Sequence, residues 1–276
     1  MPEREEKLGL ALSGGGALAA WQAAFLERVV AGGMEFSRVL GFSAGSLNGA
    51  AYCLGRLERL MDMWARVGRQ RLFSPSIRFP PLSLCSPEPM RGLLSAFMPA
   101  PRMLRELIVV SMDLGRTAPH YARFSPDGAW DGPLGERLMA SCAIPFVFPP
   151  VVLEGIAYVD GGVPGKRPVD FRALADCREV LVLEMVRPDE TGPLPGWWRP
   201  GWRLETLCRR AVRSLMDNGV RSLVSLPNGP RVFRVWPSQR LEFGMLSFGS
   251  KLLAPAMELG RADAEGFLRD PKKFVV

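Results

Sequence analysis

The sequence has little of what several common classes of protein depend on. Histidine occurs once among 276 residues, as His120, and the five cysteines are far apart, with no C-x-x-C pair. This spacing argues against a disulfide framework or a zinc site, and we expect reduced core thiols in a cytoplasmic protein. No apolar run reaches the roughly 18 residues needed to span a bilayer, and the charged start of the chain is unlike a signal peptide.

Positive charge is in excess, with 35 Lys and Arg against 28 Asp and Glu. A basic surface attracts nucleic acid or an anionic membrane, although an arginine-rich genome would give the same excess. No zinc finger, RNP-type motif or basic tract is present, so we expect no nucleic-acid partner. With 47% hydrophobic and 23% charged residues, the chain has ample material for a globular core.

An apolar strand, a sharp turn and a helix of small residues are predicted over 39–50. The turn, Gly41-Phe42-Ser43-Ala44-Gly45, is the G-x-S-x-G pattern that exposes a serine hydroxyl on a strained strand-to-helix turn. Gly41 and Gly45 let neighbouring backbone pass close to Ser43, and the start of the helix favours developing negative charge there. The pattern predicts a nucleophile, although in a chain with 29 glycines it also arises in plain loops.

A second glycine turn, Gly14-Gly15-Gly16, separates a buried strand over 8–13 from a helix over about 17–31. Its N–H groups form a nest for an anion. One possible ligand is a dinucleotide pyrophosphate, because the turn fits G-x-G-x-x-A. Dinucleotide binding also needs an acidic residue at the end of the second strand, and the candidate, Glu35, precedes that strand. The other possible ligand is the oxyanion formed when a serine attacks an ester. Both turns end parallel strands, so they share one edge of the sheet.

A third turn, Asp160-Gly161-Gly162, closes an apolar hairpin over 151–159. The two glycines leave no side chain to block approach to the carboxylate. A plain Asp-Gly turn has the same sequence, and the combination with the two earlier turns favours a functional aspartate.

His120 is expected in a loop beyond a buried strand over 107–112. Hydrolases with this serine turn order their partners Ser, Asp, His along the chain. His120 would precede the aspartate, so we expect it to be structural or to lie on the surface.

With these turns in place, the sequence resembles the patatin-like phospholipase family. The resemblance rests on residues 13–16, 41–45, 140–150 and 160–162 with Pro168-Val169, and it covers about 8–176, with a further strand over 180–186. It implies an α/β fold of three α/β/α layers with a mainly parallel central sheet, related to cytosolic phospholipase A2. It also implies hydrolysis of acyl esters by a Ser-Asp dyad, without metal or cofactor.

Carried over by motif, Ser43 would be the nucleophile and Asp160 the base. The N–H groups of Gly14, Gly15 and Gly16 would form the oxyanion hole, with Gly41, Gly45, Gly161 and Gly162 as supporting motif residues. Two positions depart from the family, which usually has Arg or Lys at Leu18 and Asn at Lys166. We expect a lipid acyl hydrolase acting on phospholipid, lysophospholipid or a simpler ester. The alternative is a catalytically impaired lipid-binding or regulatory protein.

The rest of the chain is expected to complete one domain over 1–276. Segment 71–102 is rich in proline and apolar residues and is interpreted as a cap over the site or as an irregular packed connection. The number of subunits does not follow from the sequence.

A long helix is predicted from an apolar stripe over 204–224, followed by a strand over 232–236 and a closing helix over 251–268. The polar face of the long helix carries Arg203, Arg209, Arg210, Arg213 and Arg221. With Trp197, Trp198 and Trp202 it would make peripheral contact with an anionic membrane. Alternatively, the stripe packs on the sheet and the charges are solvated.

Overall fold

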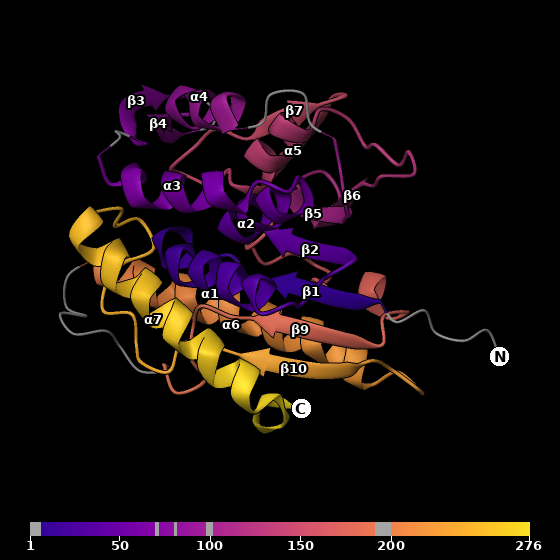
Figure 1. The fold of residues 1–276 in the computed structure, drawn as a ribbon. Coiled ribbons are helices and arrows are strands. Elements are labelled where there is room, and N and C mark those ends of the chain that lie inside the picture. Colours follow the sequence, from indigo (N-terminus) through magenta and orange to yellow (C-terminus); the bar gives the residue numbers. More distant parts are fainter. Residues whose placement is uncertain (1–6, 70–71, 80–81, 98–101, 191–199) are drawn as a thin grey trace.

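The computed structural model describes residues 7–69, 72–79, 82–97, 102–190 and 200–276. Its centre is an eight-stranded sheet in the order β10-β9-β1-β2-β5-β8-β7, with β6 also paired to β5 (Figure 1). The strands are β1 (Leu8–Leu12), β2 (Arg38–Phe42), β5 (Glu106–Asp113), β6 (Ala118–Phe124), β7 (Val151–Leu153), β8 (Ile156–Asp160), β9 (Glu179–Leu183) and β10 (Arg231–Val235).

The sheet is parallel where βα units follow one another and antiparallel at one end. β10, β9, β1, β2 and β5 are parallel neighbours. β6 and β8 both run antiparallel to β5, and β7 runs antiparallel to β8. Side chains of the parallel strands are almost all buried, as expected of strands covered on both faces. The mainly parallel sheet predicted from the sequence is confirmed.

Helices cover both faces of this sheet. They are α1 (Ala19–Ala31), α2 (Ala44–Cys53), α3 (Leu57–Val67), α4 (Glu88–Phe97), α5 (Leu134–Ser141), α6 (Pro200–Val224) and α7 (Ser250–Arg269), with short 3₁₀ turns η1 (Gly16–Leu18), η2 (Arg172–Leu174) and η3 (Pro271–Phe274). One apolar core joins the sheet to α1, α2, α3 and α7, and a second joins it to η2 and α6. Figure 1 shows α7 and α1 in front of the sheet and α6 behind it. The three α/β/α layers are thus confirmed.

Segment 71–102, interpreted as a cap or an irregular connection, contains regular structure in its described part. Strands β3 (Ser74–Arg78) and β4 (Ser83–Ser86) pair antiparallel and are followed by α4. Phe73 packs against Phe148 and Phe248, with ring centroids 5.7 and 5.5 Å apart. The segment is therefore packed onto the body of the protein, and its role as a cap stays a prediction.

His120 does not lie in a loop, as the sequence analysis expected. It is part of β6 and pairs with Ser111 of β5. On the other edge of β5 the same Ser111 pairs with Asp160, which places the backbones of the histidine and the aspartate about 10 Å apart from the spacing of strands. The expectation was wrong because seven residues of β6 pair with the long strand β5, and such long-range pairing outweighs the weak local pattern.

His120 is half-buried, and its ring packs against Tyr158 with centroids 5.1 Å apart. Burial lowers the pKa of its imidazole, and the positive charge of Arg137 lowers it further. The side chain is therefore held as a neutral, structural group.

Candidate active site

Ser43 lies on a strained turn between β2 and α2, as the G-x-S-x-G pattern predicts. Its φ of 53° and ψ of −136° are unusual for a residue with a side chain. The flanking glycines are required by close approach: a Cβ on Gly45 would lie 2.4 Å from the carbonyl oxygen of Ser13, and one on Gly41 would lie 2.8 Å from that of Gly45. The tight packing around the turn holds the serine in this conformation.

The Ser43 hydroxyl donates a hydrogen bond to Asp160. Its Oγ lies 2.7 Å from Oδ2 of the carboxylate, and both residues are buried. Asp160 ends β8, and its other oxygen, Oδ1, accepts the N–H of Gly162 at 2.7 Å. Gly161 passes so close to β5 that a Cβ there would lie 2.4 Å from the Val110 carbonyl oxygen. The two motifs, 117 residues apart in the chain, meet in one hydrogen-bonded pair.

Burial raises the pKa of Asp160 from 3.8 to about 6, although its hydrogen bonds from Ser43 and Gly162 act in the opposite direction. Desolvation dominates because the carboxylate is buried, and no charged group of the described residues is among the causes that shift its pKa. A carboxylate with this pKa is mostly ionised at neutral pH and is a stronger base than an exposed aspartate.

The glycine turn lies directly beside the serine. A Cβ on Gly14 would lie 2.9 Å from Cβ of Ser43, and one on Gly16, where φ is 55°, would lie 2.1 Å from the Met245 carbonyl oxygen. In the described loops, the N–H groups of Ser13 and Ala17 make backbone hydrogen bonds, and those of Gly14, Gly15 and Gly16 between them make none. N–H donors of this kind can bind an anion next to the serine.

Sequence reasoning missed Ser141, which lies at the end of α5 and is fully buried. Its Oγ accepts the N–H of Ser43 at 2.9 Å and donates to the Val110 carbonyl oxygen at 2.6 Å. Two residues later, the Ala143 carbonyl accepts the N–H of Asp160 at 3.0 Å. The stretch 140–150 is part of the family resemblance, but no sequence pattern around Ser141 indicates a role for its hydroxyl.

The sequence profile of the family described as patatin-like phospholipase matches residues 10–171, more than half of the chain and inclusive of all three turns. The chain belongs to this family.

Individual relatives of this patatin-like protein are distant. Lysophospholipase NTE1 of Mycosarcoma maydis is 25% identical over 212 residues, which are 69% of this chain and 10% of that protein. The chain therefore spans about a tenth of the length of this curated relative.

Solved structures resemble it at still lower identity. VipD from Legionella pneumophila is 14% identical, with a TM-score of 0.48 over 96% of this chain and 67% of that one. The complex of ExoU with SpcU, from the type III secretion system of Pseudomonas aeruginosa, is 15% identical, with a TM-score of 0.32 over 98% and 60%.

The two departures from the family pattern lie in different surroundings. Leu18 is fully buried on η1, within the core shared with α1. Lys166 is exposed, and its N–H is bonded to the Thr117 carbonyl at 2.8 Å. Leu18 therefore packs as part of the core, without a charge beside the glycine turn.

A chain of polar contacts, buried or partly buried, supports the glycine turn of this patatin-like protein. The Met245 carbonyl accepts the N–H of Ala17 at 2.7 Å. The N–H of the same Met245 is bonded to both carboxylate oxygens of Glu205, at 3.1 and 3.0 Å. Glu205 in turn accepts Nε of Arg209, one turn further along α6, at 2.9 Å. The turn beside the serine is thus connected to α6 through one loop.

Arg209 is not on a solvated face, as the helical pattern predicted, but only 1% exposed. Its guanidinium pairs with Glu190 and donates to the Leu241 and Phe243 carbonyls at 3.1 and 2.7 Å. The pattern could not show this because these acceptors come from loops up to 34 residues away. Trp197 and Trp198, invoked for the same helix, lie outside the described residues.

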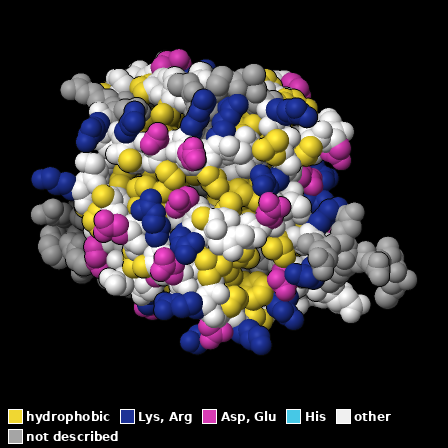
Figure 2. Space-filling view, in the orientation of Figure 1, with side chains coloured by type: hydrophobic (Ala, Val, Ile, Leu, Met, Phe, Trp, Pro, Cys, Tyr) yellow, Lys and Arg dark blue, Asp and Glu magenta, His cyan; other side chains and the backbone are white. Residues whose placement is uncertain are grey.

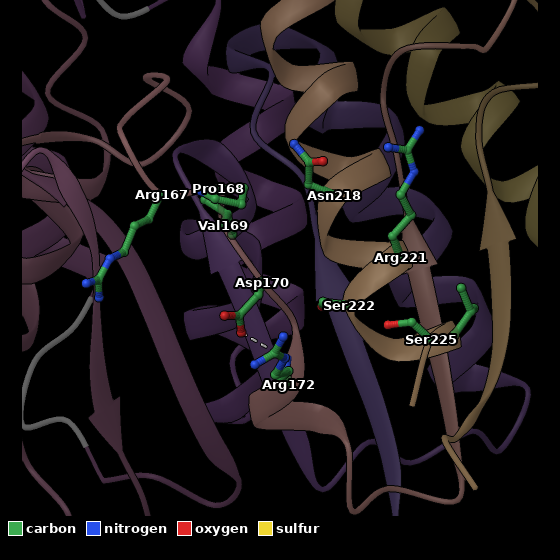
Figure 3. A pocket seen from close by; sticks show the side chains of 10 residues that line it. Arg167, Pro168, Val169, Asp170, Arg172, Asn218, Arg221, Ser222 and Ser225 are labelled. Carbon is green, nitrogen blue, oxygen red and sulfur yellow. Dashed lines mark hydrogen bonds between the residues drawn. The ribbon is translucent and has the colours of Figure 1, made fainter. Parts of the chain in front are cut away.

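Figure 2 shows Lys and Arg interspersed with Asp and Glu on the visible face. A cavity of about 570 Å³ lies between residues 167–172 and the end of α6, and neither Ser43 nor Asp160 lines it. In Figure 3 the side chains of Arg167, Arg172 and Arg221 around it point in different directions. This cavity is separate from the dyad and presents no convergent anion site.

Within the described part of the chain, no helix combines the length and apolar character needed to cross a membrane. In the same residues, no group of three or more His, Cys, Asp and Glu side chains is placed to hold a metal ion.

Proposed function

We propose that this patatin-like protein hydrolyses an acyl ester of a lipid, with Ser43 as the nucleophile and Asp160 as its base. The observation that carries the proposal is the 2.7 Å hydrogen bond between the two side chains on a strained turn. Family membership and the similarity to a lysophospholipase support a phospholipid, lysophospholipid or simpler carboxylic ester as substrate.

The reaction follows from the positions of these groups. Ser43 Oγ attacks the ester carbonyl carbon as its proton passes to Asp160 Oδ2, and the carbonyl oxygen becomes an oxyanion. The N–H groups of Gly14, Gly15 and Gly16 stabilise this charge. Collapse of the intermediate breaks the ester bond, and the leaving alcohol takes the proton from Asp160. Water then attacks the acyl-enzyme carbonyl as one of its protons passes to Asp160. Collapse of this second intermediate breaks the bond to Ser43 Oγ, which takes the proton from Asp160, and the fatty acid is released.

On this proposal the chain is one catalytic domain over 1–276, and segment 71–102 is its cap. Cys53, Cys142 and Cys177 are buried free thiols, which are common in the reducing cytoplasm. A cytoplasmic enzyme that meets its substrate at a membrane surface fits these features.

The test is hydrolysis of p-nitrophenyl butyrate and of phosphatidylglycerol vesicles. Ser43→Ala and Asp160→Asn should each lose at least about 10³-fold in rate, because removing one member of such a unit disables it. The matched controls are Ser95→Ala and Asp62→Asn, which change exposed residues and should retain wild-type rates.

Folded wild type that is inert on both substrates, or a Ser43→Ala variant as active as wild type, would refute the enzyme. Vesicle binding without hydrolysis would instead support the impaired lipid-binding alternative raised by Leu18 and Lys166.

A further inference from the structure

One face of the β3–β4 hairpin is apolar. Arg78 pairs with Ser83, next to an irregularity of the antiparallel register between Pro75 and Arg78. Ile77 and Leu84 are the strand neighbours of this pair. Phe79 directly follows Arg78, and Leu82 directly precedes Ser83. Because side chains alternate between the faces of a strand, Ser83 points the other way, and it is fully buried. The hairpin therefore has a buried face and an opposite face of large apolar side chains.

These side chains are exposed. Ile77 and Phe79 have exposed fractions of 79% and 82%, and Leu82 and Leu84 have 44% and 49%. Phe146, 67% exposed, adjoins them, because its carbonyl accepts the N–H of Leu84 at 2.9 Å and its backbone bridges to Ser83. Its φ of 67° is rare for a residue with a side chain. These five residues are called the hairpin surface below.

The hairpin surface is connected to the candidate active site through residues 141–148. Ser141 holds the N–H of Ser43, and the Ala143 carbonyl holds that of Asp160. Three residues further on is Phe146. Figure 1 shows the hairpin at the same end of the molecule as α5, which carries Ser141. Whatever covers the hairpin surface is therefore brought to the segment that contacts both members of the dyad.

We propose that Ile77, Phe79, Leu82, Leu84 and Phe146 insert into the surface of an anionic phospholipid bilayer and hold the active site at the interface. Apolar side chains gain stability at the acyl boundary without needing a complementary partner. The net charge of +7 favours an anionic leaflet. Four side chains on one hairpin, with Phe146 beside them, fall short of the roughly 800 Å² per partner of a standard protein interface, which disfavours a second copy as the occupant. This inference rests on the proposed lipid substrate.

The test compares Ile77→Ser/Phe79→Ser with a matched pair, Leu207→Ser/Val276→Ser. The control residues are each 61% exposed and lie on α6 and at the C-terminus. Binding to phosphatidylglycerol vesicles is measured by co-sedimentation, and hydrolysis is measured on the vesicles and on soluble p-nitrophenyl butyrate. The hairpin variant should bind vesicles about 10- to 100-fold more weakly, from the apolar area removed. Its hydrolysis of vesicles should fall in step, and its rate on the soluble ester should stay at the wild-type value.

Three results would overturn the inference: unchanged vesicle binding in the hairpin variant, a larger loss in the α6 control, or a wild-type dimer that the hairpin variant converts to monomer. If the proposed enzymatic function fails and the membrane inference holds, the results differ from these. In that case wild type would not cleave the soluble ester, and its vesicle binding would still depend on the hairpin residues. Circular dichroism and thermal unfolding verify that each variant is folded.

Discussion

Two segments flank the Ser43–Asp160 pair, and they are built in opposite ways. The glycine turn, 14–16, is buried and is connected through Met245 to charged groups inside the protein. Segment 141–148 leads within a few residues to the exposed apolar hairpin surface. On the proposed function, the glycine turn keeps hydrogen-bond donors fixed where the negative charge of the oxyanion develops. Segment 141–148 faces a substrate that lies in a lipid phase. Polar contacts inside the protein thus hold the glycine turn in place, and exposed apolar side chains on the hairpin surface contact the bilayer.

The largest effect on stability is expected at Arg209, on the buried side. Arg209→Met leaves the carboxylates of Glu190 and Glu205 without their buried partner, which should cost about 3–5 kcal/mol of unfolding free energy. Urea unfolding measures this. The control, Arg261→Met, breaks a half-exposed pair with Glu27 at 3.4 Å and should cost about 0–1 kcal/mol. Equal losses in the two variants would show that the buried network does not hold the loop.

The next effect tests the glycine turn itself. Gly16→Ala places a Cβ 2.1 Å from the Met245 carbonyl at a residue with φ of 55°, so the turn must shift. A displaced oxyanion donor should lower kcat by about 10²–10³. Gly92→Ala is the matched control, because a Cβ there meets nothing within 4 Å. An active Gly16→Ala variant would remove the turn from the proposed oxyanion hole.

A smaller effect follows from the pKa of Asp160, which burial raises from 3.8 to about 6. The folded state holds this proton more tightly than the unfolded state, so wild type loses stability as pH rises through this window, by up to about 3 kcal/mol. In Asp160→Asn the side chain is an amide, which does not ionise between pH 4 and 8. The variant should therefore be more stable than wild type at pH 8, and the difference should shrink toward pH 4.

The same ionisation should appear in catalysis, as an acid limb of kcat/KM with an apparent pKa near 6. Thermal unfolding between pH 4 and 8 and a pH–rate profile measure the two quantities. A stability difference that does not change with pH would contradict the burial argument.

The smallest effect is expected on the exposed side. Ile77→Ser and Phe79→Ser remove side chains that are 79% and 82% exposed, so each should change the unfolding free energy by no more than about 0.5 kcal/mol. A loss of several kcal/mol would mean that the hairpin surface packs against the protein itself, and the contrast between the two segments would fail.

Local signals predicted the main elements of the candidate site. The glycines around Ser43 and after Asp160 are required by close approaches within a few ångströms, and such requirements leave a visible mark in the sequence. The parallel strands were also recognisable, because burial on both faces gives continuous apolar runs. The hydrogen bond between the two side chains could be proposed only from the family resemblance.

Other features depend on contacts that no local pattern records. Arg209 is one of several arginines on the same helix, and only its acceptors in distant loops distinguish it from its neighbours. Ser141 looks like any helical serine until its Oγ is seen between Ser43 and Val110. His120 belongs to β6 through pairing with β5. In each case the partner is far away along the chain.

The central claim is that Ser43 is a nucleophile activated by Asp160. The most direct test is to label the folded protein with a fluorophosphonate and locate the adduct by peptide mass spectrometry. The account predicts an adduct on Ser43, none in Ser43→Ala, and much slower labelling in Asp160→Asn. An adduct on another serine, no adduct on active wild type, or equally fast labelling of Asp160→Asn would contradict it.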